Sequence, residues 1–327
     1  MPARRRIIIA LGIGLLSPVA SFGQTQTRTR LIGWLRDDDP TDPLEAQYED
    51  AFKSGMRERG YVEGRDYRVE KRFAAYDESR LPALAAELVA LKVDVIVALT
   101  TPAAIATHKL TREIPIVTNA GDPVGNGLAA SLSHPGGNVT GTTSLSAELY
   151  GKRVDLLHQL LPTAQRIGFL YDPDNPADQQ GLKQFEAACN KLGLRPVRAP
   201  ARSASDLASV FGTLSRANAQ GLIVTSRSFL GSRATIIDSA ARSRLPAVYS
   251  RAVFADEGGL IAYGPDYLDV YRRGAGYVDK ILKGARPGDL PIEQPGTYEL
   301  VLNLKTARVL GIKVPDAIRL RASKVID

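Results

Sequence analysis

Two adjacent threonines offer a defined polar chemistry at the start of a predicted helix. Thr100 and Thr101 follow an apolar run at residues 93–99 and directly precede Pro102, a residue type favoured in the first turn of a helix. Thr101 is well placed to cap this helix, whose N-terminus offers free backbone N–H groups and a partial positive charge. The pair therefore suits a ligand carboxylate or phosphate. Simple helix capping, worth about 1 kcal/mol, is the alternative.

Other polar and aromatic residues stand where further predicted strands end. Asn119 is placed to hydrogen-bond a ligand, and Asp122 either contributes to the same site or opens a turn with Pro123. The second half of the chain offers similar candidates at its strand ends, namely Tyr171, Ser226, Tyr249, Tyr263 and Asp266. With Trp34, just inside the end of the first strand, the three tyrosines predict an aromatic-lined pocket for a small, planar organic ligand. Burial of these rings in the core is the alternative.

Patterns typical of catalysis are missing from the sequence. There is no G-x-S-x-G nucleophile elbow, no G-x-x-x-x-G-K-[ST] phosphate loop and no H-E-x-x-H zinc motif. The glycine-rich stretch at residues 121–127 lacks the G-x-G-x-x-G spacing that dinucleotide binding requires. A single cysteine cannot build a Cys-rich zinc site, and the histidines show no ligand spacing. We therefore expect no enzyme activity, no catalytic residues, no cofactor and no metal.

The first 23 residues have the pattern of a secretory signal peptide. Arginines at residues 4–6 precede an apolar stretch at residues 7–16, and small residues follow Pro18. Cleavage is expected near Gly23, or after Ser21. A membrane anchor is the alternative, but the apolar stretch is short for a bilayer span. No cysteine follows the stretch, so a lipid anchor is excluded, and we predict a periplasmic protein that is not membrane-anchored.

The basic charge of the chain no longer indicates nucleic-acid binding once this leader is removed. The full chain has 42 Lys and Arg against 35 Asp and Glu, a net charge of +7. Removal of three arginines with the leader lowers it to about +4, and the remaining charges are interspersed, so nucleic acid is not expected as a partner. Export also explains the single cysteine, because an oxidising compartment disfavours unpaired thiols. Cys189 is predicted to be a buried packing residue of a helix.

Short apolar strands alternate with amphipathic helices along the mature chain, which is the signature of a parallel α/β sheet. In the first half, strands are predicted at residues 30–36, 67–73, 93–99 and 114–118, and helices at 43–59, 78–91, 102–110 and shortly before Pro135. In the second half, strands are predicted at 166–171, 195–199, 221–225, 247–249 and 260–263, and helices at 145–161, 177–192, 205–217 and 233–242. A helix at 267–282 and a strand at 298–304 follow.

This alternation predicts two doubly wound, Rossmann-like lobes joined by a hinge, and a length of 327 residues suits two such units. The first lobe is expected at residues 24–141 and the second at 142–264. Residues 265–327 are expected to cross back to the first lobe through the helix at 267–282 and to complete both lobes. Because ligands bind beyond the carboxyl ends of parallel strands, the two lobes should form one cleft.

Several motifs carry a family resemblance that covers nearly the whole mature chain. They are IPIV at residues 114–117, GDPV at 121–124, PGGNVTG at 135–141, LPAVY at 245–249, GGL at 258–260, YGP at 263–265, LPIEQP at 290–295 and NLKTA at 303–307. In these motifs the chain resembles the ABC-transporter substrate-binding proteins related to the tryptophan/tyrosine-binding family. The resemblance implies a type I periplasmic-binding-protein fold, a monomer, hinge closure around one small solute and delivery to an inner-membrane ABC permease.

The resemblance also implies a ligand class, an aromatic amino acid or a related carboxylate. The ligand carboxylate would be held by hydroxyl and backbone N–H groups of the first lobe. Carried onto this sequence, one side of the site would consist of Thr100, Thr101, Asn119 and Asp122. The other side would consist of Tyr171, Ser226, Tyr249, Tyr263 and Asp266.

Other functions would use the same cleft. An extracytoplasmic sensor that presents its solute to a receptor kinase is the main alternative, and the sequence does not separate it from transport. A LacI-like regulator would need an N-terminal helix-turn-helix, where the leader stands instead. A hydrolase would need a nucleophile–base pattern, which is missing.

Overall fold

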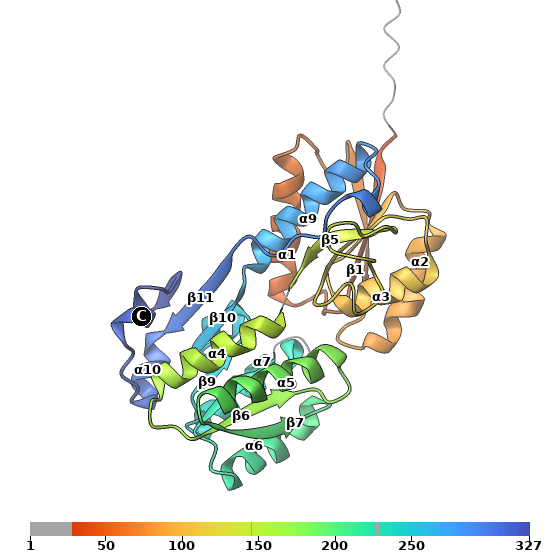
Figure 1. The fold of residues 1–327 in the computed structure, drawn as a ribbon. Helices are drawn as coiled ribbons and strands as arrows, with labels where there is room; N and C mark the ends of the chain where they lie inside the picture. The colour runs from red at the N-terminus through yellow and green to blue at the C-terminus, as the bar shows by residue number, and fades with distance from the viewer. Residues whose placement is uncertain (1–27, 145, 226–228) are drawn as a thin grey trace, which may run out of the picture.

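The computed structural model describes residues 28–144, 146–225 and 229–327, which form two lobes on separate β-sheets (Figure 1). The expected leader at residues 1–23 and the candidate Ser226 lie outside the described residues. The first sheet has the order β2-β1-β3-β4-β5, with every neighbouring pair parallel. Its strands are β1 (Arg30–Arg36), β2 (Tyr67–Phe73), β3 (Val95–Ala98), β4 (Ile116–Ala120) and β5 (Val139–Thr143).

The second sheet has the order β12-β11-β10-β9-β8-β6-β7. Only the β10–β11 pair of this sheet is antiparallel within the described part of the chain. The strands are β6 (Arg166–Tyr171), β7 (Arg195–Pro200), β8 (Gly221–Val224), β9 (Ala247–Tyr249), β10 (Ile261–Pro265), β11 (Tyr298–Asn303) and β12 (Lys324–Ile326). The first lobe therefore has a purely parallel sheet, and the second carries an antiparallel edge.

Helices cover both faces of the first sheet (Figure 1). They are α1 (Pro43–Arg57) and α9 (Tyr267–Leu282) on one face, and α2 (Leu81–Ala90) and α3 (Thr101–Leu110) on the other. Adjacent residues of β3 point to opposite faces, so that Val97 packs with α1 and α9 while Ile96 packs with α2 and α3. Helices α1 and α9 lie so close that a Cβ on Gly55 would be 2.6 Å from the Arg272 carbonyl oxygen.

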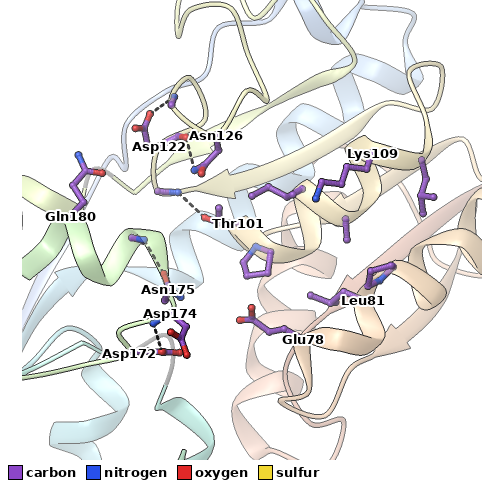
Figure 2. Close-up of a pocket in the computed structure, with 18 residues that line it drawn as sticks. Glu78, Leu81, Thr101, Lys109, Asp122, Asn126, Asp172, Asp174, Asn175 and Gln180 are labelled. Atoms are coloured by element: carbon purple, nitrogen blue, oxygen red, sulfur yellow. Dashed lines mark hydrogen bonds between the residues drawn. The ribbon is translucent and has the colours of Figure 1, made fainter. Parts of the chain in front are cut away.

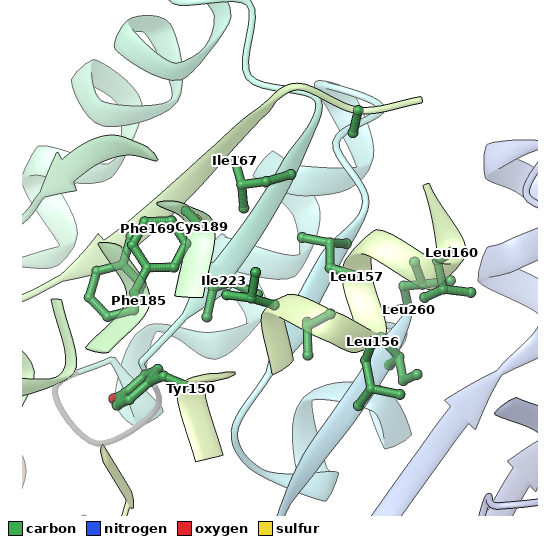
Figure 3. Close-up of a cluster of buried hydrophobic side chains, with 14 of the residues drawn as sticks. Tyr150, Leu156, Leu157, Leu160, Ile167, Phe169, Phe185, Cys189, Ile223 and Leu260 are labelled. Carbon is green, nitrogen blue, oxygen red and sulfur yellow. The ribbon is translucent and has the colours of Figure 1, made fainter. Parts of the chain in front are cut away.

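The second sheet is covered in the same way. Its helices are α4 (Ser146–Leu160), α5 (Pro176–Lys191), α10 (Leu304–Leu310) and α11 (Asp316–Arg319) on one face, and α6 (Leu207–Arg216), α7 (Arg233–Arg242) and α8 (Ala252–Asp256) on the other. Cys189 is fully buried in the cluster formed by α4, α5 and the sheet (Figure 3). Burial raises the pKa of its thiol to about 12, which fits the predicted packing role.

The structure confirms the predicted class of two doubly wound α/β lobes. It also corrects one local prediction and adds elements that were not predicted. The stretch at residues 121–134 contains turns in place of the short helix predicted before Pro135. Strand β5, α8 and the elements after β11 were not predicted, because they are short and, in β5, interrupted by Gly141. Gly141 has a φ of +135°, a conformation that favours glycine.

The chain passes between the lobes after β5, after β10 and before β11 (Figure 1). On its way to β11, the segment around Glu293 pairs with Thr142 of β5. The lobes are also joined by side chains, since Arg233 at the start of α7 forms a two-point ion pair with Asp42, at 2.6 and 3.1 Å. Within the described residues, no helix has the length and apolar character needed to cross a membrane.

Candidate ligand-binding site

Two adjoining cavities lie between the lobes, at the carboxyl ends of strands from both sheets. The larger, named here the outer groove, has a volume of about 950 Å³ (Figure 2). The smaller, named the inner cavity, has a volume of about 80 Å³. Thr101, Gly121 and Ala177 line both. The polar and aromatic residues that line the inner cavity are Thr100, Thr101, Asn119, Ser144, Tyr150, Arg153, Asp178, Thr225, Ser250, Arg251 and Tyr267.

The N-terminus of α3 faces the inner cavity, as the two threonines predicted. Thr100 is the N-cap residue, with extended backbone, and its side chain makes no capping hydrogen bond. Its hydroxyl is buried without a partner among the described residues. The capping role predicted for Thr101 is wrong, because Thr101 is the first residue of the helix and its Oγ1 accepts a 3.0 Å hydrogen bond from Gly121 N–H. This helix end is therefore open to a ligand.

The other two candidates of the first lobe lie on either side of this end. Asn119 is buried at the end of β4 and lines the inner cavity, where its Oδ1 accepts a 3.0 Å hydrogen bond from the Thr142 hydroxyl. Asp122 lines the outer groove, and its carboxylate accepts a 2.8 Å hydrogen bond from Gly125 N–H. Asp122 thus opens a turn, as its alternative interpretation expected.

Most of the predicted aromatic residues lie in the core. Trp34 packs against Phe52 and donates a 2.8 Å hydrogen bond to Glu45. Tyr171 stacks on Phe169, and Tyr249 is almost completely buried against Phe254. These three rings line neither cavity. These three residues therefore do not form the predicted aromatic pocket, and their alternative interpretation as core residues is correct.

Tyr263 and Asp266 lie where the chain leaves β10 for α9. The Tyr263 carbonyl oxygen accepts a hydrogen bond from Arg153, and the Asp266 carboxylate caps α9 by accepting a 3.1 Å hydrogen bond from Asp269 N–H. Neither residue lines the two cavities. Two tyrosines that sequence reasoning missed, Tyr150 and Tyr267, supply the aromatic walls of the inner cavity.

Arg153 of α4 was also missed. Its side chain is 1% exposed, and its Nε donates a 2.8 Å hydrogen bond to the Tyr263 carbonyl oxygen. The guanidinium carbon lies 5.0 Å from the centre of the Tyr150 ring. One terminal nitrogen, Nη1, has no hydrogen-bond partner among the described residues. Arg153 thus brings a buried cation to the inner cavity and retains an unmet donor.

Arg251, which follows β9, brings a second buried cation. Its guanidinium carbon lies 3.8 Å from the centre of the Tyr267 ring, and Nη1 donates a 3.0 Å hydrogen bond to the Tyr48 hydroxyl. Its Nε has no partner in the described part of the chain. The sequence could have identified Arg251 as a candidate site residue, because it stands two residues after the predicted strand 247–249. Nothing similar points to Arg153, since it lies in the middle of a helix.

The inner cavity carries a positive charge. No carboxylate of the described residues lies within ion-pair distance of Arg153 or Arg251. Burial lowers the pKa of Arg153, whereas Tyr267, Tyr48 and Asp38 outweigh the effect of burial and raise the pKa of Arg251. Both stay charged at neutral pH. Asp178 is the acidic residue among those lining the cavity, and it accepts hydrogen bonds from Thr225 Oγ1 and Asp172 N–H, both 2.9 Å.

The outer groove has a different chemistry, which Figure 2 shows. Its first-lobe wall includes Leu81, Ile105 and Leu110, and its second-lobe wall includes the carboxylates of Asp172 and Asp174. Burial, Asp172 and Asp178 raise the pKa of Glu78, so charges of the two lobes influence each other across the groove. The groove therefore combines apolar side chains of the first lobe with carboxylates of both lobes, including Glu78 and Asp122 of the first, and with Lys109.

The described residues of the two cavities offer groups that can bind a solute. Among the described residues, no three histidine, cysteine, aspartate or glutamate side chains are grouped so that they could hold a metal ion. The polar groups of the inner cavity include hydroxyls, two guanidinium groups and the Asp178 carboxylate, which accepts a hydrogen bond from Thr225 Oγ1. The arrangement is that of a binding site enclosed by two lobes.

The sequence profile of one family, described as ABC transporter substrate binding protein, matches residues 42–326. The chain belongs to this family. It is a family of solute-binding proteins that are typically extracytoplasmic, not a class of enzymes. The family resemblance stated from the sequence motifs is confirmed.

Individual relatives agree with this assignment. The chain is 26% identical to a tyrosine-binding protein of Clostridioides difficile (strain R20291), over 80% of this chain and 76% of that protein. A structure from Streptococcus pneumoniae, described as the ABC domain in complex with L-Trp, superposes with a TM-score of 0.83 at 26% identity, covering 91% of this chain and all of that one. A conserved domain protein of Vibrio cholerae gives a TM-score of 0.83 at 25% identity over the same shares. The type I periplasmic-binding-protein fold is thereby confirmed.

Proposed function

We propose that this protein is the periplasmic solute receptor of an ABC importer and binds a small organic solute with a carboxylate group, an aromatic amino acid or a related acid. The observation that carries the proposal is the inner cavity, where the open N-terminus of α3 from one lobe faces two buried guanidinium groups from the other. Donors of this kind favour an anionic group. The tyrosine-binding and L-Trp-bound relatives support the ligand class.

The two lobes give the protein a way to hold its solute. Contacts to Thr100 and Asn119 come from the first lobe, and contacts to Arg153 and Arg251 come from the second. A solute that touches both sets favours the closed arrangement, because only that arrangement provides both. We expect the hinge motion at residues 141–142 and 263–264, where the chain leaves one lobe for the other.

The remaining parts of the proposal concern location and partners. The leader pattern supports export, with cleavage near Gly23 and release as a protein without a membrane anchor. The family supports delivery of the solute to an inner-membrane ABC permease. We propose that the receptor acts as a monomer, with boundaries between the lobes near residues 142 and 264.

Isothermal titration calorimetry on the mature chain tests the proposal. Tryptophan, tyrosine, phenylalanine, aromatic acids and a panel of other amino acids would be titrated separately. We expect at least one carboxylate to bind at a one-to-one ratio, with a decrease of the radius of gyration in solution scattering as the lobes close. Turnover of a solute, or no binding by any compound, would contradict the proposal.

A further inference from the structure

The start of helix α1 in the first lobe contacts the second lobe through both polar and apolar side chains. At the N-cap of this helix, the Asp42 carboxylate accepts hydrogen bonds of 2.6 and 3.1 Å from the Arg233 guanidinium group. Leu44, in the first turn, packs against core residues of both lobes. The Tyr48 hydroxyl accepts a 3.0 Å hydrogen bond from Arg251. The start of α1 is therefore a surface on which the lobes meet.

A second segment of the first lobe, after β2, reaches the same place. The Tyr76 hydroxyl donates a 2.6 Å hydrogen bond to Asp42, and a Cβ on Gly231 of the second lobe would be only 2.7 Å from the Tyr76 ring. Ala75 and Tyr76 have φ values of +54° and +63°, a left-handed conformation that is strained for residues with a side chain. The turn thus retains a strained backbone at the point where Tyr76 meets the second lobe.

These contacts form one unit, named here the lobe latch. The ion pair within it is well shielded, because the Asp42 side chain is 8% exposed and the Arg233 side chain 14% exposed, so salt and water screen it less than a surface pair. Burial acts to raise the pKa of Asp42, but hydrogen bonds from Arg233, Tyr76 and the Leu44 N–H group together lower it. The latch consists of Asp42, Leu44, Tyr48 and Tyr76 of the first lobe and Gly231, Arg233 and Arg251 of the second.

The latch and the outer groove lie beside different helices of the lobes. The latch joins the starts of α1 and α7, which cover one face of each sheet, whereas the groove lies between α3 and α5, which cover the other faces. At the latch the lobes touch directly, and at the groove a space of about 950 Å³ lies between them (Figure 2). The protein itself therefore closes one side of the cleft and leaves room for a solute on the other.

We propose that the lobe latch stabilises the closed arrangement of the lobes and so raises the affinity for the solute without contacting it. Asp42, Gly231 and Arg233 line neither cavity, so they act as positioning residues. Separation of the lobes breaks the latch, because its partners belong to different lobes. The latch therefore shifts the equilibrium toward the form in which both half-sites face one solute. This inference rests on the proposed receptor function.

Gly231→Val tests the latch with a wedge. The added side chain collides with the Tyr76 ring, so that the latch cannot close. We expect the radius of gyration of the ligand-free protein to increase in small-angle scattering, with an unchanged circular dichroism spectrum because both lobes stay folded. The affinity for L-tryptophan or L-tyrosine in calorimetry should fall about tenfold if the closed fraction falls tenfold. Gly212→Ala in α6 is the control, because a Cβ there would meet only the Arg216 side chain, at 3.4 Å, and it should behave as the wild type does.

A double-mutant cycle tests the ion pair itself. Asp42→Asn retains the side-chain oxygen that caps α1 and removes the charge, and Arg233→Gln removes the opposite charge. Each should lower the affinity about tenfold, and the double variant should bind about as weakly as either single one, because both changes break the same contact. Glu257→Gln is the matched control, since it removes the pair that Arg233 makes within its own lobe, and it should leave the affinity unchanged.

The outcomes separate the latch from the function on which it rests. Scattering of the ligand-free protein needs no solute, so an unchanged radius of gyration in Gly231→Val and Asp42→Asn would overturn the latch whatever binds. A larger radius with unchanged affinity, or independent losses in the double-mutant cycle, would contradict its role in binding. Failure of the wild type to bind any compound of the panel would contradict the receptor function, and scattering would still decide whether the latch holds the lobes together.

Discussion

Two sites in this protein bury arginine side chains, and they differ in what surrounds the charge. In the first lobe, Arg36 donates hydrogen bonds to the carboxylates of Glu45 and Asp38. Between the lobes, Arg153 and Arg251 have no carboxylate of the described residues within ion-pair distance, although all three guanidinium groups lie over tyrosine rings and each has one nitrogen without a partner among these residues. The guanidinium groups of the two sites are buried to nearly the same degree.

The difference separates a structural charge from a functional one. A buried cation with a carboxylate partner is neutralised by the fold, so removal of the partner leaves an uncompensated charge and destabilises the protein strongly. A buried cation without such a partner already contributes that unfavourable energy to the ligand-free state. A solute carboxylate that neutralises such a cation would explain why it is retained. We assign this situation to Arg153, whose pKa is lowered by burial, whereas the tyrosines and Asp38 around Arg251 already offset its burial.

The largest effect is expected at the neutralised site. Glu45→Ala removes a partner of Arg36 and the acceptor of the Trp34 N–H group. We expect the free energy of unfolding to fall by about 3–5 kcal/mol, because a buried cation and a buried donor lose their partners. Urea denaturation measures this loss. Glu113→Ala, at an exposed position, should leave the free energy of unfolding unchanged, and a loss at Glu45 of under about 1 kcal/mol would contradict the structural role.

The opposite behaviour is expected at Arg153. Arg153→Met should lower the free energy of unfolding of the ligand-free protein by no more than about 1–2 kcal/mol, since the Tyr263 carbonyl oxygen loses a hydrogen bond but no carboxylate loses its partner. Ligand at about 100 times its dissociation constant should stabilise the wild type by about 2.7 kcal/mol. If the variant binds about 100-fold more weakly, the same ligand concentration gives only about 0.4 kcal/mol. Thermal unfolding with and without ligand measures both quantities, and equal ligand stabilisation in the two proteins would remove the contrast between the two arginine sites.

A smaller effect is expected at the donor on the first-lobe side. Thr100→Val retains the shape of the side chain and removes its unpartnered hydroxyl. The affinity for a carboxylate should fall about tenfold, equivalent to about 1.4 kcal/mol, without loss of stability. Calorimetry measures the affinity, with Thr213→Val on the exposed side of α6 as the control. Unchanged affinity would place the solute away from the N-terminus of α3.

Much of the fold followed from the sequence because its strands and helices are strongly periodic. The predicted strands at 30–36, 67–73 and 166–171 have the bounds that the structure shows, as does the helix at 267–282. Strand β5 was missed because VTGTT is short and contains glycine, so its place in the sheet depends on tertiary pairing with β4.

The site was harder to predict than the fold. Residues after the strands of the first lobe, such as Thr100 and Asn119, were found because a parallel sheet brings its strand ends together. Tyrosine residues at strand ends were assigned to a pocket but fill the core, since a strand end can bury its last side chain under a helix. Arg153 was missed because a cation within an amphipathic helix is usually solvent-exposed, and only the packing of α4 against the crossing segments shows that it is buried.

The smallest effect concerns an acidic group that faces neither cavity. Glu299 of β11 is partly exposed, and burial, together with Asp266 and Asp256, raises the pKa of its carboxyl to about 7. In the unfolded chain the pKa is close to 4.3. The folded state therefore holds this proton more tightly, and wild-type stability falls as the pH rises from about 4 through about 7. Glu299→Gln removes this pH-dependent loss, so it should stabilise the protein at pH 8 by about 1 kcal/mol, after allowance for solvent screening, and leave stability unchanged at pH 4.

Urea denaturation at the two pH values measures the difference, and calorimetry should show unchanged affinity for the solute. An equal effect at both pH values would mean that packing, not charge, is responsible. A change in affinity would mean that charges outside the inner cavity also influence binding, and the distinction between structural and functional charges would then have to include the segment that joins the lobes.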